Sequence, residues 1–344
     1  MSTVDVVIPC YNYARYLSGC VESVLSQAGV EVRLLIIDDA SSDNTLEVGQ
    51  ALALTDRRIE YLRHDVNKGN ISTYNEGLLG WASAEYVVLL SADDMLAAGS
   101  LNRAVGIMNG DKNIGMVYGP VIHFREEGAL PKGTAKKFTY TRFSGAEWLN
   151  VRCRAGHNVI TSPEVVVRRT VQQAVGGYRS ELPHAGDLEM WLRIAAVSDV
   201  AFVRRVPQAF YRVHSLSMTK ERTSFVDLRQ RKAAFDLFFR CHPDLPNGHV
   251  LRGWAGKALA REALWQACRA YDRNEVKEAS ADELVQFASE ACPSAAELPE
   301  SRALRRRKAL GPLMCKTTQI FAASGALHRA HRMMKTWQWK RRGI

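Results

Sequence analysis

The sequence predicts an α/β fold with a mostly parallel sheet flanked by helices, followed by an all-helical C-terminal region. Up to His214, short apolar runs typical of buried strands alternate with longer segments whose apolar residues recur at helical spacing. Strands that alternate with single helices form right-handed βαβ units, and such units build a parallel sheet. Beyond His214 the pattern is almost wholly helical. We therefore expect two domains, residues 1–218 and 219–344.

The expected elements follow in order along the chain. The strands are apolar runs at residues 4–8, 32–37, 59–62, 86–90, 115–119, 164–167, 201–205 and 209–213. The helices of the first domain lie at residues 13–27, 41–54, 70–83, 99–108, 144–151 and from 187 onward. A polar and basic stretch with Gly128, Pro131 and Gly133 is expected to be a loop over the functional site. The later helices are expected at residues 221–241, 249–272, 281–291 and 301–340.

Composition excludes several classes of protein. The 344 residues include 47% hydrophobic ones, enough for two ordinary cores. The seven cysteines are widely spaced without a Cys-x-x-Cys pair, which argues against a disulfide framework or a zinc site. No run of eighteen apolar residues is present, so no membrane-spanning helix is expected. Because a strand begins next to the first Met, no room is left for a leader segment, and we expect a cytoplasmic protein.

The positive charge is concentrated at the C-terminal end. The net charge is +10, yet residues 301–344 contain twelve Lys and Arg and no Asp or Glu. A region of this kind favours an anionic partner, and we expect an anionic membrane surface at the inner face of the membrane or a lipid-linked acceptor. A solvated basic face is the alternative. No nucleic-acid partner is expected, because the region has no recognised motif and few aromatic residues apart from Trp337 and Trp339.

Pairs of adjacent carboxylates follow two of the expected strands. Asp38 and Asp39 come after residues 32–37, and Asp93 and Asp94 come shortly after residues 86–90. Adjacent ionised side chains repel each other, so an apolar strand that ends on them indicates a cation or hydrogen-bond donors nearby. Hard divalent ions prefer carboxylate oxygens and often share their coordination shell with substrate phosphates. The Asp93–Asp94 pair therefore indicates a metal and a diphosphate-bearing substrate at the carboxyl end of its strand, with an Asp-rich turn as the alternative.

Four segments, taken together, resemble the family 2 glycosyltransferases. In chain order they are Val7-Ile8-Pro9-Cys10-Tyr11-Asn12, Ile36-Ile37-Asp38-Asp39-Ala40-Ser41-Ser42-Asp43-Asn44-Thr45, Asn67-Lys68-Gly69-Asn70 and Ser91-Ala92-Asp93-Asp94. The resemblance covers about residues 3–218. It implies the GT-A fold, a Rossmann-like arrangement, and transfer of a sugar from a nucleotide diphosphate with inversion.

The resemblance implies a donor site at the matching positions. Pro9 and Tyr11 would contact the nucleoside base, and Asp39 would accept a hydrogen bond from the ring N–H of uracil. Asn67 and Lys68 would lie near the ribose and the phosphates. The neighbouring Asp38 would hold the turn, which is also the ordinary structural role of such an acid.

The same resemblance implies a metal site for Mg²⁺ or Mn²⁺. Asp93 and Asp94 match the later part of the family's Asp-x-Asp motif, and His214 follows the last strand where the family often has a metal or diphosphate ligand. Arg212 could instead pair with the diphosphate. Ser91 stands where the family often has the first Asp, which usually contacts the ribose, and a serine can still form one hydrogen bond there.

A second segment resembles the acceptor side of the family. Gly176-Gly177-Tyr178 precedes Gly186-Asp187-Leu188-Glu189, and the family has a Glu-Asp pair here whose Asp is the catalytic base. Asp187 keeps that Asp, whereas Gly186 replaces the Glu. A helix N-cap is the structural alternative for Asp187, and Glu189 is the second candidate for the base.

These inferences lead to two hypotheses about function. The first is a metal-dependent inverting glycosyltransferase that uses a UDP-sugar or similar donor and a glycan or lipid-linked hydroxyl acceptor, in the synthesis of bacterial cell-surface polysaccharide or glycolipid. The second, motivated by Ser91 and Gly186, is a sugar-nucleotide-binding protein with impaired transfer. The sequence leaves the sugar, the acceptor and the oligomeric state open.

Overall fold

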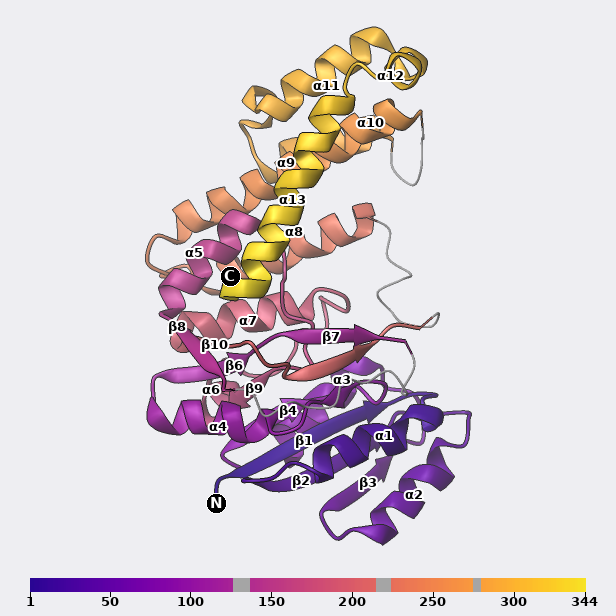
Figure 1. Cartoon of the computed structure of the whole chain (residues 1–344), viewed down its shortest axis with the longest axis vertical. Coiled ribbons are helices and arrows are strands. Elements are labelled where there is room, and N and C mark those ends of the chain that lie inside the picture. The colour runs from indigo at the N-terminus through magenta and orange to yellow at the C-terminus, as the bar shows by residue number, and fades with distance from the viewer. Residues whose placement is uncertain (126–136, 215–223, 275–279) are drawn as a thin grey trace. The chain divides into compact units, whose positions relative to one another are not determined.

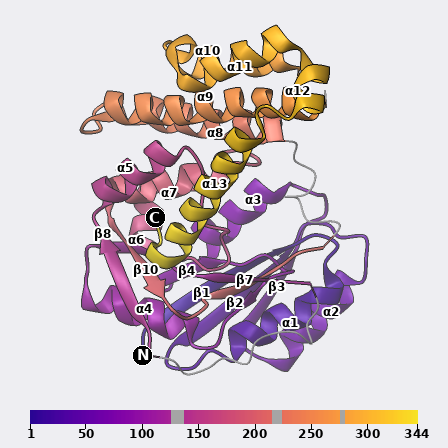
Figure 2. The same ribbon diagram turned by 45° about the horizontal axis from the view of Figure 1, so that its top comes forward.

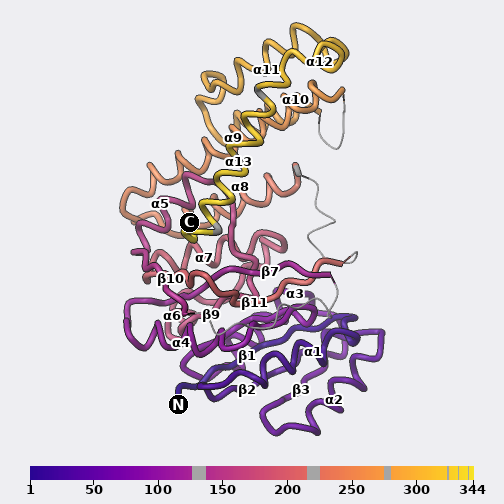
Figure 3. Tube along the Cα trace, viewed as in Figure 1, coloured from indigo at the N-terminus to yellow at the C-terminus, as the bar shows by residue number. Residues whose placement is uncertain are grey.

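The computed structural model describes residues 1–125, 137–214, 224–274 and 280–344 (Figures 1 and 3). By its internal contacts the chain divides into two compact units. Unit 1 comprises Met1–Trp148, Val159–Ser217 and Arg341–Gly343, and unit 2 comprises Leu149–Asn158, Met218–Lys340 and Ile344. The division into domains at residue 218 stays a prediction. The expected loop at Gly128, Pro131 and Gly133 lies outside the described residues.

Unit 1 is built on an eight-stranded sheet (Figure 1). In spatial order its strands are β3 (Ile59–Arg63), β2 (Glu31–Asp38), β1 (Thr3–Cys10), β4 (Tyr86–Leu89), β9 (Val166–Arg168), β6 (Ile114–Tyr118), β10 (Asp199–Arg204) and β8 (Thr139–Phe143). The β3-β2-β1-β4 half is parallel throughout, and β6 pairs parallel with β10. Strand β9 is antiparallel to β4 and β6, and β8 is antiparallel to β10. The mostly parallel sheet confirms the predicted fold class.

Helices cover this sheet and bury its apolar side chains. They are α1 (Ala14–Leu25), α2 (Thr45–Thr55), α3 (Asn70–Asn75), the π-helix η1 (Glu76–Trp81), α4 (Ser100–Gly110), α6 (Arg169–Val175) and α7 (Gly186–Val197). Helix α5 (Gly145–Ala155) begins in unit 1, and its residues from Leu149 onward belong to unit 2. Helix α1 shows why the predicted pattern forms a helix: Leu17, Val21 and Val24 recur on one face, and each is at most 1% exposed. They pack with Val6, Ile8 and other strand residues in one core.

A second, three-stranded sheet brings distant parts of unit 1 together. Strand β11 (Ala209–Arg212) pairs antiparallel with β5 (Met95–Leu96) and parallel with β7 (Val121–Phe124). Phe210 is paired with Met95. Because antiparallel strands run past each other, the residues just before β5 lie beside those at the end of β11. This pairing is what brings Asp93 and Asp94 to Arg212.

Among the described residues of unit 1, strands β5, β7 and β8 and helix α6 were not predicted. Strands β5, β7 and β8 are short or half exposed, and they obtain their hydrogen bonds from strands distant in sequence. Helix α6 has only 7 residues. Short segments of this kind carry too little periodicity to be recognised from local sequence.

Unit 2 is helical, as predicted. It contains α8 (Ser224–Cys241), α9 (Gly248–Arg273), α10 (Ala281–Ala291), the 3₁₀ helix η4 (Ala295–Glu297), α11 (Pro299–Leu310), α12 (Pro312–Thr318) and most of α13 (Ala322–Arg342). Helix α9 packs against α8, α10, α11 and α12 (Figure 2).

The prediction of one helix over residues 301–340 was wrong, because the structure has three helices there. Gly311 ends α11 with a φ of +76°, a conformation that glycine adopts without strain, and Pro312 begins the next helix. Gln319, in the left-handed conformation, ends α12.

The structure also bears on membrane-spanning helices and on the pairing of the cysteines. None of the helices in the described parts of the chain combines the length and the apolar composition needed to cross a membrane. All seven cysteines are free thiols; six are buried, but Cys241 is exposed.

Candidate active site

The loop after β2 is held by Asp38. Its carboxylate is fully buried and accepts hydrogen bonds from the Ser41 backbone N–H at 2.8 Å, the Tyr61 hydroxyl at 2.7 Å and the Arg63 guanidinium at 2.6 Å. Burial alone would raise the pKa of Asp38, but the hydrogen bonds from Ser41 and Tyr61 and the charge of Arg63 lower it overall. Asp38 therefore holds the turn, as the sequence indicates.

Asp39 organises the next loop. Its carboxylate accepts the backbone N–H groups of Lys68 at 2.8 Å and Gly69 at 2.9 Å, and it pairs with the imidazole Nδ1 of His64 at 2.7 Å. The Asn67 side chain donates to the Asp39 carbonyl at 3.1 Å. These hydrogen bonds bring Asp39, Asn67 and Lys68, three predicted donor residues, into one loop cluster. Asn67 and Lys68 are exposed.

His64 belongs to this cluster although the sequence analysis did not single it out. It is 3% exposed and its Nε2 lies 3.0 Å from Oε2 of Glu76, which also accepts from Lys68. A histidine at the end of a short strand has no local feature that marks this role. Its role comes from two acids elsewhere in the chain, Asp39 and Glu76, which face its two ring nitrogens.

Pro9 and Tyr11 lie where β1 ends. Pro9 is half-buried and is the second-last residue of the strand, and Tyr11, just after the strand, is 50% exposed. Next to them, Asn12 has a φ of +59°, and its side-chain oxygen accepts the Ser42 N–H at 2.8 Å. The loops after β1 and β2 are therefore joined, which places Tyr11 near the Asp39 loop with its ring accessible.

Asp93 and His214 form a partly exposed polar pair. Nε2 of His214 lies 2.9 Å from Oδ2 of Asp93, and their side chains are 10% and 13% exposed. The His214 ring is packed by Tyr13 and Tyr16, each with a centroid 5.4 Å away. These two tyrosines come from the start of α1, and the sequence analysis did not assign them to the site. Ser91, half-buried, accepts the Asp94 N–H on its backbone carbonyl at 3.0 Å.

Asp94 and Arg212 lie beneath this pair. Asp94 is 2% exposed and accepts the Arg212 backbone N–H at 2.9 Å. Burial, followed by the charge of Asp93, raises the pKa of Asp94 well above its usual value. The Arg212 guanidinium is 3% exposed, donates to the Asp93 carbonyl at 2.9 Å, and lies over the rings of Tyr16 and Phe124.

Asp94 as a metal ligand and Arg212 as a diphosphate contact stay predictions. Both side chains are buried and face protein groups, because the paired strands β5 and β11 bring them together in the interior.

Asp187 lies in the first turn of α7. The helix begins at Gly186 after the N-cap Ala185, so Asp187 is not the cap residue. Oδ1 of Asp187 lies 3.4 Å from the Ser162 hydroxyl, and its side chain is half-buried. Glu189 has a different environment: it is fully buried in a bidentate ion pair with Arg193, at 2.8 and 2.9 Å from its Nε. Glu189 is therefore a structural residue and not a second candidate for the base.

The phenol of the half-buried Tyr74 is affected by carboxylates from two parts of the site. Its pKa is raised first by burial, then by the carboxylate of Asp187, and more weakly by that of Asp93. A second acid, the buried Glu164, raises the pKa of Asp94, and the charge of Asp187 in turn raises the pKa of Glu164. The carboxylates of Asp93 and Asp187 therefore both act on the Tyr74 phenol.

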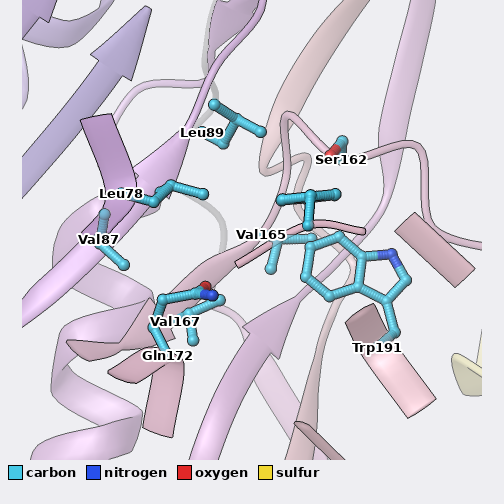
Figure 4. Close-up of a pocket in the computed structure, with 9 residues that line it drawn as sticks. Leu78, Val87, Leu89, Ser162, Val165, Val167, Gln172 and Trp191 are labelled. Atoms are coloured by element: carbon cyan, nitrogen blue, oxygen red, sulfur yellow. The ribbon is translucent and has the colours of Figure 1, made fainter. Parts of the chain in front are cut away.

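A small cavity lined mostly by apolar side chains lies in unit 1 (Figure 4). It is lined by Leu78, Val87, Leu89, Ser162, Val165, Val167, Gln172, Tyr178 and Trp191. Trp191 is 3% exposed, so it is a core residue. None of the predicted donor residues lines this cavity.

The sequence of this unit matches a known family. A family profile described as "Glycosyl transferase family 2" matches residues 5–168. The domain belongs to glycosyl transferase family 2. The resemblance inferred from the strand-end motifs is thereby confirmed.

Similar curated proteins are glycosyltransferases of bacteria. Glycosyltransferase GlyG of Streptococcus pneumoniae is 33% identical over 93 residues, 27% of this chain and 31% of GlyG. Chondroitin synthase of Pasteurella multocida is 25% identical over 203 residues, 59% of this chain and 20% of the synthase. UDP-Glc:alpha-D-GlcNAc-diphosphoundecaprenol beta-1,3-glucosyltransferase WfgD of Escherichia coli is 28% identical over 201 residues, 58% of this chain and 72% of WfgD. The chain thus spans about a third or less of the length of the first two.

Solved structures extend the similarity to nearly the whole chain. S. aureus TarS 1–349 in complex with UDP-GlcNAc has a TM-score of 0.65 at 14% identity, covering 94% of this chain and 92% of that one. Mannosyltransferase PcManGT from Pyrobaculum calidifontis, in complex with GDP-Man and Mn²⁺, has a TM-score of 0.55 at 18% identity, covering 94% and 86%. At these identities the likeness concerns the fold, which is the GT-A fold followed by helices.

Proposed function

We propose that this protein is an inverting, metal-dependent glycosyltransferase that moves a sugar from a nucleotide-diphosphate donor to a hydroxyl group. The observation that carries the proposal is the Asp93–His214 pair, with Nε2 of His214 2.9 Å from Oδ2 of Asp93, in the unit that matches the family 2 profile and that also holds Asp187 at the start of α7. Inversion needs a proton acceptor on one face of the sugar and stabilisation of the departing diphosphate on the other. Two separate carboxylate positions within one site of a family 2 domain suit both requirements.

Asp93 and His214 fit a divalent cation such as Mg²⁺ or Mn²⁺. A carboxylate oxygen and an imidazole nitrogen lie 2.9 Å apart, and both are partly exposed. Among the residues that the structure describes, no group of three or more possible ligands occurs. Water and the donor's phosphates would therefore complete the shell, as is usual for Mg²⁺. When bound, the cation would neutralise charge on the departing diphosphate.

The loop cluster around Asp39 is the proposed site of the nucleoside. Asp39 holds the backbone of Lys68 and Gly69, while Tyr11 offers an exposed ring that could contact a base. Solved structures of similar fold contain UDP, UDP-GlcNAc or GDP-Man. We favour UDP, because a carboxylate can accept the ring N–H of uracil.

Asp187 is the proposed general base. Its carboxylate would take the proton of the acceptor hydroxyl while the acceptor oxygen bonds to the anomeric carbon and the bond to the diphosphate oxygen breaks. General-base help of this kind contributes about 10² to 10⁴ in rate. The acceptor is proposed to be a glycan or lipid-linked glycan of a bacterial surface polymer, in line with the printed activity of WfgD.

Nucleotide sugars, tested as a panel, decide the proposal. Purified protein is incubated with UDP-, GDP- and dTDP-sugars with and without Mn²⁺ or Mg²⁺, and release of free nucleotide and melting temperature are measured. We expect one donor class to raise the melting temperature only with metal and to be hydrolysed slowly. No turnover and no stabilisation with any donor would contradict the proposal.

Asp187→Asn separates the two hypotheses about function. If Asp187 is the base, the variant loses turnover while donor binding stays within about twofold. Asp244→Asn, at an exposed acid of unit 2, is the matched control and should keep both. Donor binding without turnover in the unmodified protein would favour the alternative, a sugar-nucleotide-binding protein with impaired transfer.

The C-terminal helices are proposed to contact an anionic membrane surface. Arg307 does not contribute, because it is 1% exposed and paired with Asp272. Helices α12 and α13 instead carry large exposed apolar side chains: Leu313, Met314, Leu327, Met333, Met334 and Trp337. Exposed Lys316, Arg329 and Lys335 lie on the same helices. Apolar groups among basic ones suit the interface of an anionic bilayer.

Sedimentation with lipid vesicles tests the proposed membrane contact. Leu327→Glu with Trp337→Glu should lower co-sedimentation with vesicles that contain anionic phospholipid, and neutral vesicles should bind neither protein. Leu54→Glu, at a residue of unit 1 that is 89% exposed, is the control. Equal sedimentation of the variant and the unmodified protein would reject the membrane contact.

A further inference from the structure

Two hydroxyl groups lie against the carboxylate of Asp187. The Ser162 hydroxyl is 3.4 Å from Oδ1 of Asp187. The Tyr178 hydroxyl is within hydrogen-bonding reach of both Asp187 and Ser162. Burial, followed by the charge of Asp187, raises the pKa of Tyr178 well above its usual value, so the phenol stays protonated and donates. All three residues belong to unit 1.

Ser162 is held in a strained conformation to reach this position. Its φ of +93° is unfavourable for a residue with a Cβ atom. The turn around it is fixed by Glu164, whose carboxylate is 4% exposed and accepts the backbone N–H of Thr161 at 2.8 Å and its hydroxyl at 2.9 Å. The Val165 N–H closes the turn on the Ser162 carbonyl at 3.0 Å. A strained residue that is fixed from both sides and directed at a candidate base indicates a functional constraint.

Tyr178 is fixed just as firmly. It is 5% exposed, its ring packs edge-to-face on Tyr74 with centroids 5.5 Å apart, and its backbone N–H and carbonyl both bond to the Asn75 side chain, at 2.7 and 2.9 Å. These contacts leave the phenol few alternative positions.

Gly186 gives the Tyr178 ring its place. A Cβ atom added at Gly186 would lie 3.1 Å from Cδ1 of Tyr178, closer than ordinary contact. The position where the family's Glu would stand is therefore partly occupied by the tyrosine ring. Glycine at position 186, in place of the family's Glu, thus leaves room for the Tyr178 ring, whose hydroxyl approaches Asp187.

We propose that Tyr178 and Ser162 are positioning residues that orient the Asp187 carboxylate, and that Gly186 is required because a side chain there would displace Tyr178. The inference rests on the proposed role of Asp187 as general base. It goes beyond that role, because it assigns the orientation of the base to two hydroxyl groups and explains why glycine stands before it.

Steady-state kinetics with the donor that the panel identifies tests the proposal. Tyr178→Phe keeps the ring and removes the hydroxyl, so kcat should fall about tenfold, a part of the general-base contribution, while KM for the donor stays within about twofold. Ser162→Ala should lower kcat in the same way. Ser162→Asn, which keeps a donor and tolerates positive φ, should restore part of the loss. Tyr140→Phe, at a tyrosine that is 48% exposed, is the matched control.

Gly186→Ala tests the coupling to Tyr178. The added methyl should lower kcat in the unmodified protein but have a smaller effect in the Tyr178→Phe background, where the displaced hydroxyl is already absent. Additive effects would contradict the coupling. An unchanged kcat in Tyr178→Phe would overturn the positioning role. A Tyr178→Phe variant that loses melting temperature and donor binding together with kcat would also overturn it, because the hydroxyl would then be merely structural.

The outcomes separate this inference from the proposed function. If Asp187→Asn abolishes turnover while Tyr178→Phe and Ser162→Ala leave it unchanged, only the positioning role fails. If Asp187→Asn keeps turnover, the proposed base is wrong, whatever the other variants do.

Discussion

Nε2 of His214 lies 2.9 Å from Oδ2 of Asp93, although 121 residues separate them in the chain. The contact results from the pairing of β11 with β5, which sets the end of one strand beside the start of the other. Asp94 and Arg212 lie under it, joined through the Arg212 N–H at 2.9 Å. The pair is thus the accessible part of a buried polar cluster.

Removal of either member of this pair should remove the dependence on metal. We expect Asp93→Asn and His214→Ala each to lower kcat by at least about 10²-fold, since a Lewis-acid cation contributes several kcal/mol of charge stabilisation. A chelator should have the same effect on the unmodified protein. Turnover with and without added Mn²⁺ is the measurement, and Asp65→Asn, at an exposed acid, is the control. Full activity in the presence of chelator would show that no divalent ion is needed.

Asp39 should matter for both stability and nucleotide binding. Asp39→Ala leaves the N–H groups of Lys68 and Gly69 without their acceptor, and each lost partner costs about 1–3 kcal/mol where the groups stay buried. Asp39→Asn keeps an acceptor oxygen and should lose less. The melting temperature and the Kd for UDP, measured by calorimetry, check this. Equal melting temperatures for the unmodified protein and Asp39→Ala would show that the loop does not depend on the carboxylate.

The ion pair of Glu189 and Arg193 should be structural. Glu189→Ala leaves the Arg193 charge, 2% exposed, without its partner, and breaking a buried pair in this way costs about 3–5 kcal/mol. Arg193 also donates to the Gly177 carbonyl at 2.8 Å, so the turn before Tyr178 should loosen. Denaturant unfolding measures the loss. A variant that keeps its stability but loses turnover would instead return Glu189 to consideration as the base.

The sequence predicts those parts of the site that local patterns encode. Asp39, Asp93 and Asp187 could be singled out because each follows an apolar strand or opens a helix in a recognisable motif. The burial of Asp94 and Arg212 could not, because it depends on the pairing of β5 with β11.

Some further features depend on residues distant in sequence, and one could have been predicted from a local motif but was not. Tyr13 and Tyr16 pack on His214 from the start of α1, which no local pattern indicates. The turn that holds Ser162 at positive φ depends on a carboxylate two residues further on, and serine there gives no sign of strain. The break between α11 and α12 was readable from Gly311-Pro312, yet the basic composition of the segment suggested one long helix.

Glu164 should make the folded state less stable as the pH rises. Burial, the largest cause, raises its pKa from 4.5 to about 7, and the nearby charge of Asp187 adds to the shift. Between these values the unfolded chain has released the proton while the folded chain still holds it, so the free energy of unfolding falls as pH rises and levels off above about 7. At roughly 1.4 kcal/mol per pH unit, the total is on the order of 3 kcal/mol.

Glu164→Gln isolates this effect, because the amide has nearly the same shape and can still bond to Thr161 but does not ionise. The variant and the unmodified protein are compared by melting temperature at each pH from 4 to 8, so that the titration of all other groups cancels. We expect similar values near pH 4 and a growing advantage of the variant up to about pH 7, beyond which the difference stays constant. A difference that is the same at every pH would mean that the pKa of Glu164 is the same in the folded and the unfolded chain.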